Sequence, residues 1–529
     1  MAAGIMKTDI IMKSAAAVAL AASLAGCTKN FVDFNTNKHE ATDEQVLPVL
    51  AGSLFQQMER TVIIYRDGTG TLDSDYQVAY NLCADTWAGY NAPTLGDGRN
   101  NGSFYINDNW SRSLWVNKYS KSMNAYSSLA SRMEGSSDTH IMALADIVKV
   151  TSMHQVTDYY GPVPYSKVGT SLTPEYDSQE QVYRQMLSEL DQAIEVLENY
   201  VTANPSAKIL ADYDLVYGGD PLKWIRFANS MRLRLAMRVI YADGELARTE
   251  AEKSLNDPFG LVDGNSGNAV VGGVDHHPIY EINVNFNDAD TQMGASMDCY
   301  LNGYDDPRKF LIAKPASDGN LHGVRNGIHN TNWNPYKNAA GKVSAPNATK
   351  YKIVWLNAAE VYFLRAEAAL RGWNAGGSAK DFYEAGVAAS FEEWGAQGAD
   401  TYLRNSTAVP AAFVDVVGNA SAAAPSTITV AYSDSDDFET NLERIMTQKW
   451  LAIYPNGCEA WAEYRRTRYP RLITPANNDS NGTVDTDLQI RRVPYPISEQ
   501  SDNARGLATG LSVLGGPDHA GTKLWWDKK

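Results

Sequence analysis

The stretch VWLNAAEVYFLRAEAALRGWNAGGSAKDFYEAGVAASFEEW, residues 354–394, decides the fold class. Residues 354–371 are rich in alanine and apolar nearly all round, which predicts a helix in the protein interior. Glu367 and Arg371 have the i,i+4 spacing of an ion pair on one helix face. After a glycine-rich break, residues 378–394 predict a second helix. A helix–turn–helix unit of about 40 residues is typical of stacked helical repeats.

A second strong helix is predicted after Asp220-Pro221, where an aspartate N-cap precedes proline at the first helical position. Apolar residues then recur at steps of three and four: Trp224, Ala228, Met231, Leu235 and Val239. Gly244 is expected to lie beyond the end of this helix. The basic side chains that flank the stripe, Arg232, Arg234 and Arg238, are interpreted as ion-pair partners of neighbouring acidic helices.

Two more helices complete the predicted scaffold, one from Thr173-Pro174 to Tyr200 and one over residues 438–454. The connections between helices are long and rich in Gly, Asn and Asp: residues 67–75, 87–110, 256–298, 313–350 and 395–437. Loops of this length in a compact protein are usually functional or disordered. The chain therefore predicts a mainly α protein of helix pairs with long loop insertions.

The start of the chain predicts export. A cationic lead and an Ala-rich apolar run precede Leu24-Ala25-Gly26-Cys27, the pattern of a secretory signal peptide over residues 1–26. The run is shorter than the roughly 20 apolar residues of a membrane span. Leu-Ala-Gly-Cys resembles the bacterial lipobox, which makes Cys27 the expected lipid-attachment residue, with palmitate among its acyl chains. Residues 27–529 are expected to form one large domain, tethered to a membrane that it does not cross.

Composition excludes some partners. The net charge of −16 argues against nucleic acid, because phosphate binding needs a basic face. Beyond Cys27 the chain has Cys83, Cys299 and Cys458, which show neither a disulfide framework nor metal-ligand spacing. We interpret all three as small buried apolar residues.

Little in the sequence indicates catalysis. It contains no GxSxG, HExxH or Walker loop, and with 62 acidic residues, paired carboxylates occur by accident. His276 and His277 are adjacent, so on an extended segment their side chains point apart and do not predict a shared metal. Asp288 and Asp290 are candidates for a structural calcium. The sequence thus predicts a protein that is not an enzyme and holds no cofactor.

Several motifs, in this order, resemble the SusD/RagB family of lipid-anchored nutrient-binding proteins. They are Phe34-Asn35-Thr36-Asn37, Asp158-Tyr159-Tyr160-Gly161-Pro162-Val163-Pro164-Tyr165, Lys223-Trp224-Ile225-Arg226-Phe227-Ala228-Asn229-Ser230, Asp305-Asp306-Pro307-Arg308, Leu356-Asn357-Ala358-Ala359-Glu360 with Ala366-Glu367-Ala368, and Arg491-Arg492-Val493-Pro494-Tyr495-Pro496. Together they extend over almost the entire chain.

The resemblance implies a tetratricopeptide-like α-helical scaffold whose long loops build a glycan-binding face. It also implies an outer-membrane location facing the exterior and a partner, a TonB-dependent (SusC-like) channel that the lipoprotein caps. One departure is Thr28-Lys29-Asn30-Phe31, since surface-displayed members often carry acidic residues directly after the lipid cysteine. Glu360, Glu367 and the arginines of the motifs are interpreted as buried ion pairs.

Sugar binding pairs aromatic rings with amides and carboxylates, which exchange hydrogen bonds with hydroxyls. Three stretches have this content, with these candidate ligand-binding residues: Asp85, Trp87, Tyr90 and Asn91; Trp333 and Tyr336; and Arg66 and Asp67. The alternative for Trp87 is that it packs its loop onto the scaffold.

These observations predict a binding protein that captures an oligosaccharide and delivers it to the channel. Three alternatives stay open. The same scaffold could bind peptides, in which case Trp87 and Trp333 are packing residues. The chain could be a surface glycoside hydrolase, or a lid with no ligand of its own.

Overall fold

The structure is a computed structural model that describes residues 43–65, 74–94, 96–285, 291–329, 336 and 341–529. Its contacts divide the chain into two units, residues 1–51 and 52–529. In the first unit the described residues, 43–51, begin helix α3 (Asp43–Glu59). The predicted signal peptide and Cys27 lie outside the described residues, so they and the predicted boundary after residue 26 stay predictions.

The larger unit is mainly α-helical, as predicted. Its longer helices are α7 (Asn124–Met133), α8 (Thr139–Tyr160), α9 (Gln179–Ala203), α10 (Pro221–Arg238), α11 (Gly244–Leu255), α13 (Ala295–Gly303), α16 (Ala358–Leu370), α17 (Ala379–Trp394), α19 (Phe438–Ala452), α20 (Gly457–Thr467) and α22 (Ala504–Val513). Shorter helices are α4 (Ser74–Tyr76), α5 (Asp108–Ser111), α6 (Ser113–Asn117), α12 (Pro278–Tyr280), α14 (Lys309–Ile312), α18 (Ala399–Leu403) and α21 (Glu499–Asp502). Segments η1 (Gln77–Asp85), η3 (Lys118–Met123) and η5 (Glu281–Asn285) are π-helical, and η2 (Asn101–Ser103), η4 (Asn265–Gly267) and η6 (Ala348–Lys350) are 3₁₀-helical.

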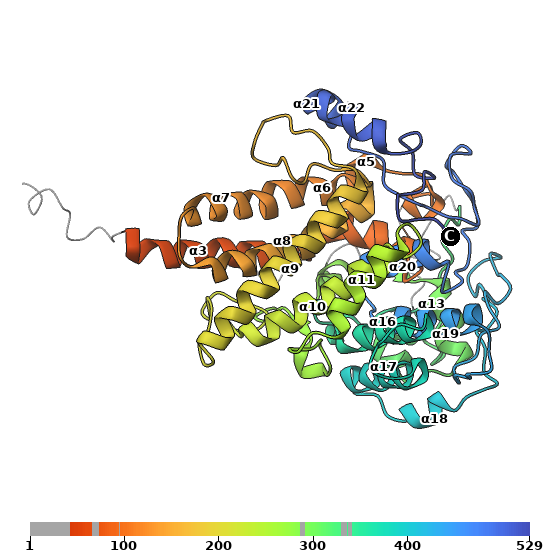
Figure 1. The fold of residues 1–529 in the computed structure, drawn as a ribbon. Coiled ribbons are helices and arrows are strands. Elements are labelled where there is room, and N and C mark those ends of the chain that lie inside the picture. The colour runs from red at the N-terminus through yellow and green to blue at the C-terminus, as the bar shows by residue number, and fades with distance from the viewer. Residues whose placement is uncertain (1–42, 66–73, 95, 286–290, 330–335, 337–340) are drawn as a thin grey trace, which may run out of the picture. The chain divides into compact units, whose positions relative to one another are not determined.

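Helices that follow one another in the chain pack as pairs. The pairs α8–α9, α10–α11 and α16–α17 lie side by side, and α16 also packs against α19 and α10 (Figure 1). The helix–turn–helix unit that the sequence predicts over 354–394 is thus the pair α16–α17, and α16 is central, as its apolar character indicated.

The helix starts that the sequence predicts correctly are those with an N-cap side chain. The Asp220 carboxylate accepts hydrogen bonds from the backbone N–H groups of Leu222 and Lys223, which confirms the N-cap of α10. Ser378 and Asp437 cap α17 and α19 in the same way. Gly244 lies beyond the end of α10, at Arg238, as predicted; it is the first residue of α11, which Asp243 caps.

Two predicted helix starts are wrong. Helix α9 begins at Gln179, because Ser178 and Gln181 form a capping box there, rather than at Thr173-Pro174. Residues 354–356 form strand β6 (Val354–Leu356), which pairs with β2 (Ala269–Val270), and α16 begins only after the Asn357 N-cap. In both cases the residues before the cap are extended because they pair with another segment of the chain. Asp177 pairs with Val163, and β6 pairs with β2.

Buried ion pairs join the helices at the centre. Arg234 of α10 lies 2.6 Å from Glu360 of α16, and Arg238 lies 2.6 Å from Glu459 of α20. The buried ion-pair cluster consists of Arg234, Arg238, Glu360, Glu367, Arg371, Lys449, Glu459, Glu463 and Arg466. Arg232 pairs with Asp191 and Glu367 with Arg371, so the ion pairs predicted for these arginines are confirmed.

Glu367 makes this cluster sensitive to acid. Burial alone would raise the pKa of Glu367, but Arg466 and Arg371 outweigh it and lower the pKa from 4.5 to about 2. This stabilisation is complete above pH 4.5 and is lost as the pH falls through 2, because the unfolded chain binds the proton first. We expect about 3 kcal/mol of unfolding free energy to disappear over this range. Urea unfolding between pH 6 and 2 measures it, and a free energy that stays constant contradicts the prediction.

The loops form short antiparallel pairs outside the helix pairs. Strand β1 (Asn91–Pro93) pairs with β3 (Thr291–Met293), and β4 (Ala313–Lys314) pairs with β5 (Ala345–Pro346). The α21–α22 segment lies beside α5 despite its distance in sequence (Figure 1): the backbone N–H of Ile497 donates to Asp108 Oδ1.

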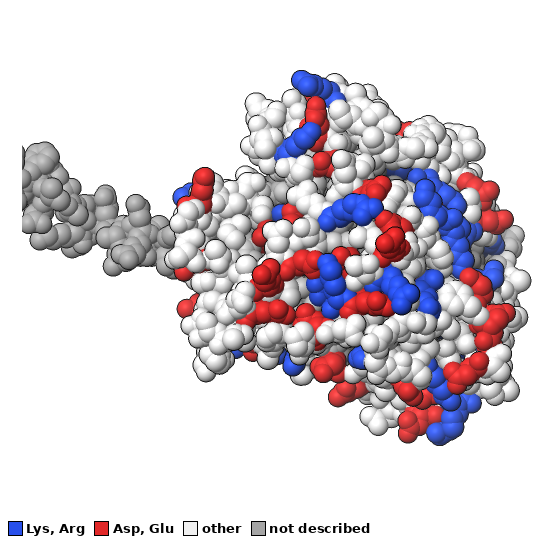
Figure 2. All heavy atoms as spheres, in the orientation of Figure 1, with Lys and Arg blue, Asp and Glu red and all other residues white. Residues whose placement is uncertain are grey.

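The surface over α9–α11 mixes both signs of charge (Figure 2). Arg184 pairs there with Glu180 and Asp243, and Arg248 pairs with Glu252. Cys83, Cys299 and Cys458 are buried free thiols, which confirms their predicted environment. Within the described ranges, none of the helices combines the length and apolar character that crossing a bilayer requires.

Candidate functional site

Several predicted site residues lie outside the described residues. These are Cys27, Arg66, Asp67 and Trp333, together with the calcium candidates Asp288 and Asp290. They stay predictions. The described candidates are Asp85, Trp87, Tyr90, Asn91 and Tyr336.

The two aromatic loops of the sequence, 87–110 and 313–350, meet in the fold. The side-chain amide of Asn326 donates to the backbone carbonyls of Thr86 and Asn91, at 3.2 and 3.4 Å. Ala92, Val324, Ile328 and Tyr336 form a shared apolar cluster. Tyr336 is buried, and its hydroxyl donates to Asp415 Oδ2 at 3.0 Å. The described parts of the two loops thus pack against each other.

Trp87 and Tyr90 lie in the interior. The Trp87 ring contacts Trp461, with centroids 4.8 Å apart, and its Nε1–H donates to the Asn101 carbonyl. The Tyr90 ring stacks on Trp450, and its hydroxyl donates to the Trp450 carbonyl. Neither ring offers a free face to solvent. This placement favours the packing alternative for Trp87, and a ligand role for either residue stays a prediction.

The variant Trp87→Phe separates packing from binding. It keeps an aromatic ring but removes the indole donor of the buried Asn101 carbonyl, which then accepts only from the Phe104 N–H, so we expect about 1 kcal/mol less unfolding free energy. Glycan affinity should stay within twofold of wild type. Denaturant unfolding and titration calorimetry measure the two quantities. A selective loss of affinity at unchanged stability would restore Trp87 as a ligand contact.

Asn91 differs from its neighbours because its polar atoms are unsatisfied. Its side chain is fully buried in β1, opposite Met293, and neither Nδ2 nor Oδ1 has a hydrogen-bond partner among the described residues. A buried amide without partners costs free energy unless a water or ligand atom meets it.

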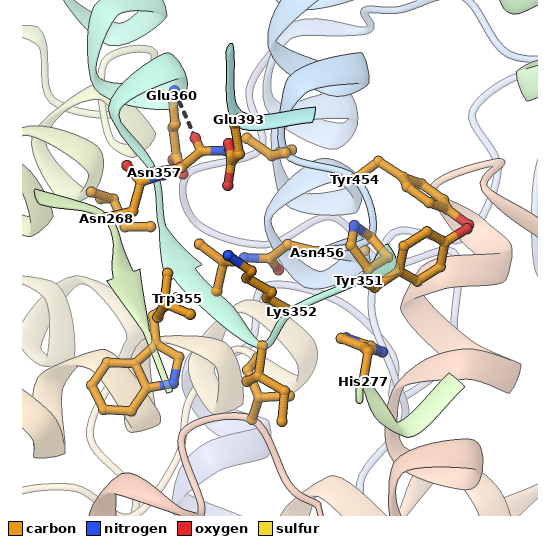
Figure 3. Close-up of a pocket in the computed structure, with 18 of the residues that line it drawn as sticks. Asn268, His277, Tyr351, Lys352, Trp355, Asn357, Glu360, Glu393, Tyr454 and Asn456 are labelled. Atoms are coloured by element: carbon orange, nitrogen blue, oxygen red, sulfur yellow. Dashed lines mark hydrogen bonds between the residues drawn. The ribbon is translucent and has the colours of Figure 1, made fainter. Parts of the chain in front are cut away.

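A polar cavity lies between η1, β6, α16, α17 and the turn that joins α19 to α20. Its volume is about 370 Å³. The lining side chains combine aromatic, amide and charged groups: Tyr76, Tyr80, Asp85, Asn268, His277, Tyr351, Lys352, Trp355, Asn357, Glu360, Glu393, Trp394, Tyr454 and Asn456 (Figure 3). Of the sequence candidates, Asp85 lines this cavity.

Aromatic rings form one wall. Tyr351 and Tyr454 meet edge to face, with centroids 5.3 Å apart and hydroxyl oxygens 3.1 Å apart (Figure 3). Trp394, at the end of α17, contacts both rings. Because Trp394 is only half-buried, it is the ring best placed to meet a ligand that enters from solvent.

Amides and a carboxyl form the opposite wall. Asn357 lies between Glu360 and Glu393 (Figure 3): its Oδ1 caps α16 at the Glu360 N–H, and its Nδ2 donates to Glu393 Oε2 at 2.7 Å. Burial raises the pKa of Glu393 to about 7, although Asn357 and Lys352 oppose the shift. Glu393 therefore titrates near neutral pH, where its carboxyl can accept or donate a hydrogen bond.

The deep end of the cavity holds groups that stay uncharged or titrate near neutral pH. Burial raises the pKa of Asp85 to about 7, and its Oδ2 accepts a hydrogen bond from the Tyr76 hydroxyl at 3.2 Å. Burial lowers the pKa of His277 to about 3, so this imidazole is neutral at pH 7. Its Nδ1 accepts the Ile279 N–H, which leaves Nε2 as the protonated nitrogen.

Trp355 supplies an unused donor. Its indole is buried on β6, and Nε1 has no hydrogen-bond partner among the described residues. Its ring packs against Trp224 and Phe227 of α10, with centroids 6.4 and 6.1 Å apart. Ligand hydroxyls can donate to the Glu393 carboxyl oxygens, so this part of the lining suits a polyhydroxylated ligand.

Sequence reasoning missed most of this site. Tyr351, Lys352 and Trp355 lie in an alternating stretch, YKIVW, which is a strand signal that the adjoining helix pattern obscured. Glu393 and Trp394 stand at a helix end where nothing local marks them. Among the residues that the structure describes, His, Cys, Asp and Glu side chains form no group of three that could hold a metal ion. His276 pairs with Glu281 and does not share a ligand position with His277.

The paired helices α8–α9, α10–α11 and α16–α17 define a protein of the helical-repeat class. The chain belongs to the SusD-like family of SusD and RagB outer-membrane lipoproteins, whose model matches residues 33–527. No curated protein matches the sequence.

Solved structures agree with this membership. A chitin-binding SusD homologue from Flavobacterium johnsoniae is 38% identical, with a TM-score of 0.86 over 90% of this chain and 99% of the homologue. SusD homologues from Bacteroides vulgatus and Bacteroides uniformis are 34% and 36% identical, with TM-scores of 0.84 and 0.82. They match 90% and 91% of this chain and 97% and 99% of their own. The predicted family and its mainly α, tetratricopeptide-like fold are confirmed.

Proposed function

We propose that this chain is a lipid-anchored glycan-binding protein of the outer membrane, with no catalytic activity of its own. The observation that carries the proposal is the 38% identity to a chitin-binding homologue along 90% of this chain. Oligosaccharides of chitin are therefore the first ligands to test, ahead of peptides.

The cavity beside β6 is the proposed saccharide site. Trp394, Tyr351 and Tyr454 provide apolar ring surface, while Asn357 and Glu393 provide hydrogen-bonding groups for hydroxyls. Its volume of about 370 Å³ lies at the lower end of the range of ligand cavities, roughly 300–1,000 Å³. The site therefore suits a short saccharide portion.

Binding and hand-over form the proposed mechanism. Lipid on Cys27 holds the protein at the outer membrane, facing the exterior, where it captures an oligosaccharide and passes it to a SusC-like, TonB-dependent channel. Affinity should be modest, because a ligand that dissociates slowly delays delivery. The channel partner and the orientation follow from the family resemblance.

A glycan array probed with the intact protein in mild detergent tests the proposal. Saturable binding to one class of glycan, with no new product after prolonged incubation, supports it. Time-dependent product would identify a glycoside hydrolase instead, and binding to peptides but no glycan would favour the peptide alternative.

A further inference from the structure

Lys352 brings a positive charge to the cavity that no protein group uses directly. Its side chain is among the lining residues, between the wall that carries Asn357 and Glu393 and the one that carries His277 (Figure 3). Among the described residues Lys352 forms no ion pair and donates no hydrogen bond. Because an ammonium group has three N–H donors, Lys352 is available to an acceptor on a ligand.

Glu393 brings an acceptor to the same cavity. Its carboxyl lies near the C-terminal end of α17, where Oε2 accepts from Asn357 Nδ2 at 2.7 Å. The charge of Lys352 acts against the rise that burial causes in the pKa of Glu393, so the two groups are close enough to interact. They nevertheless form no ion pair. A small group that accepts on one side and donates on the other can therefore stand between them.

The other carboxyl groups that line the cavity have protein partners. Glu360 pairs with Arg234 at 2.6 Å, and Glu392 Oε2 accepts a hydrogen bond from Asn265 Nδ2 at 2.9 Å. Asp85 Oδ2 accepts one from a tyrosine hydroxyl at 3.2 Å. Lys352 and Glu393 are thus the charged side chains best placed to recognise one ligand group together.

An acetamido group matches this arrangement. Its carbonyl oxygen accepts a hydrogen bond, its N–H donates one, and its methyl group is apolar. Lys352 can donate to the oxygen, and Glu393 can accept from the N–H. Trp394, the next residue after Glu393, offers ring surface to the methyl group. A hydroxyl in the same place has no methyl group to bury, and an ammonium group is repelled by Lys352.

We propose that Lys352 and Glu393 recognise the 2-acetamido group of a sugar in this cavity and make the site selective for N-acetylated glycans. The inference rests on the proposed saccharide site and adds the chemical group that is recognised. Selectivity then depends on one substituent of the sugar ring and not on the linkage of the backbone.

Three hexasaccharides with the same β-1,4 backbone test this selectivity. They are the hexamers of N-acetylglucosamine, glucose and glucosamine, which carry an acetamido, a hydroxyl or an amino group at C2. Titration calorimetry of the intact protein should give the N-acetylated hexamer an affinity about tenfold or more above both others. A smaller difference, or tighter binding of another hexamer, overturns acetamido recognition while leaving glycan binding intact. No binding of any of the three overturns the proposed function itself.

Lys352→Met tests the role of the ammonium group. The side chain is exposed, so we expect the variant to fold and to lose about tenfold in affinity for the N-acetylated hexamer, but less than twofold for the glucose hexamer. The matched control is Lys380→Met, which removes an exposed lysine of α17 outside the cavity and should change neither affinity. An unchanged preference in a folded Lys352→Met protein, with its melting temperature checked by circular dichroism, contradicts the role of Lys352.

Discussion

Replacing Glu367 by glutamine is expected to lower the unfolding free energy by about 3–5 kcal/mol. Glu367 is fully buried on α16, where its two oxygens accept hydrogen bonds from Arg466 at 2.8 and 2.6 Å and from Arg371 at 2.7 Å. Removing the negative charge leaves Arg466 with Glu463 alone, in an interior that cannot hydrate the excess positive charge. Urea denaturation at pH 7 measures the change.

The matched control is Glu384→Gln on α17. This glutamate forms an exposed i,i+4 pair with Lys380, at 3.9 Å, and we expect its removal to cost no more than about 0.5 kcal/mol. Equal effects of the two substitutions would mean that the buried ion-pair cluster does not hold α16 to α20.

Replacing Cys27 by alanine is expected to move the protein almost entirely from the membrane fraction to the soluble fraction. A single acyl chain binds a bilayer only marginally and reversibly, with a constant of about 10⁴ M⁻¹, so stable anchoring needs several chains on one residue. Without a lipid-bearing cysteine no such attachment forms. Fractionation of cells and incorporation of labelled palmitate measure the change.

Cys299→Ala is the control, because Cys299 is a buried free thiol on α13. This variant should remain in the membrane fraction and incorporate palmitate. Retention of the Cys27→Ala protein in the membrane would contradict lipid attachment at that residue and would require another anchor.

Local signals predicted the scaffold. Asp220, Ser378 and Asp437 mark helix starts through hydrogen bonds to the first few backbone amides, so their effect can be read from adjacent residues. The start of α16 could not be read in this way. Residues 354–356 are apolar and could continue a helix, and it is the pairing of β6 with β2, more than 80 residues earlier, that keeps them extended.

Trp87 and Tyr90 were predicted as ligand-binding residues, but in the structure both side chains are buried. The content of the loop after η1 resembles a sugar-binding loop, but Trp461 and Trp450, which cover Trp87 and Tyr90, are more than 350 residues away in the chain. The cavity, too, is formed by residues that are far apart in the chain. Segments η1, β6, α17 and the α19–α20 turn each contribute a few side chains, and no local sequence pattern joins them. Asp85 was predicted for its polarity and lines the cavity because η1 ends there.

The most direct test of the account is titration calorimetry of the intact protein with chitin oligosaccharides, comparing wild type with the double variant Trp394→Ala/Glu393→Gln. The control is Trp373→Ala/Glu384→Gln, which makes the same two changes outside the cavity. The account predicts saturable binding by wild type and control, and an affinity about tenfold or more lower in the cavity variant. Equal binding by all three proteins, or no glycan binding by wild type, would contradict it.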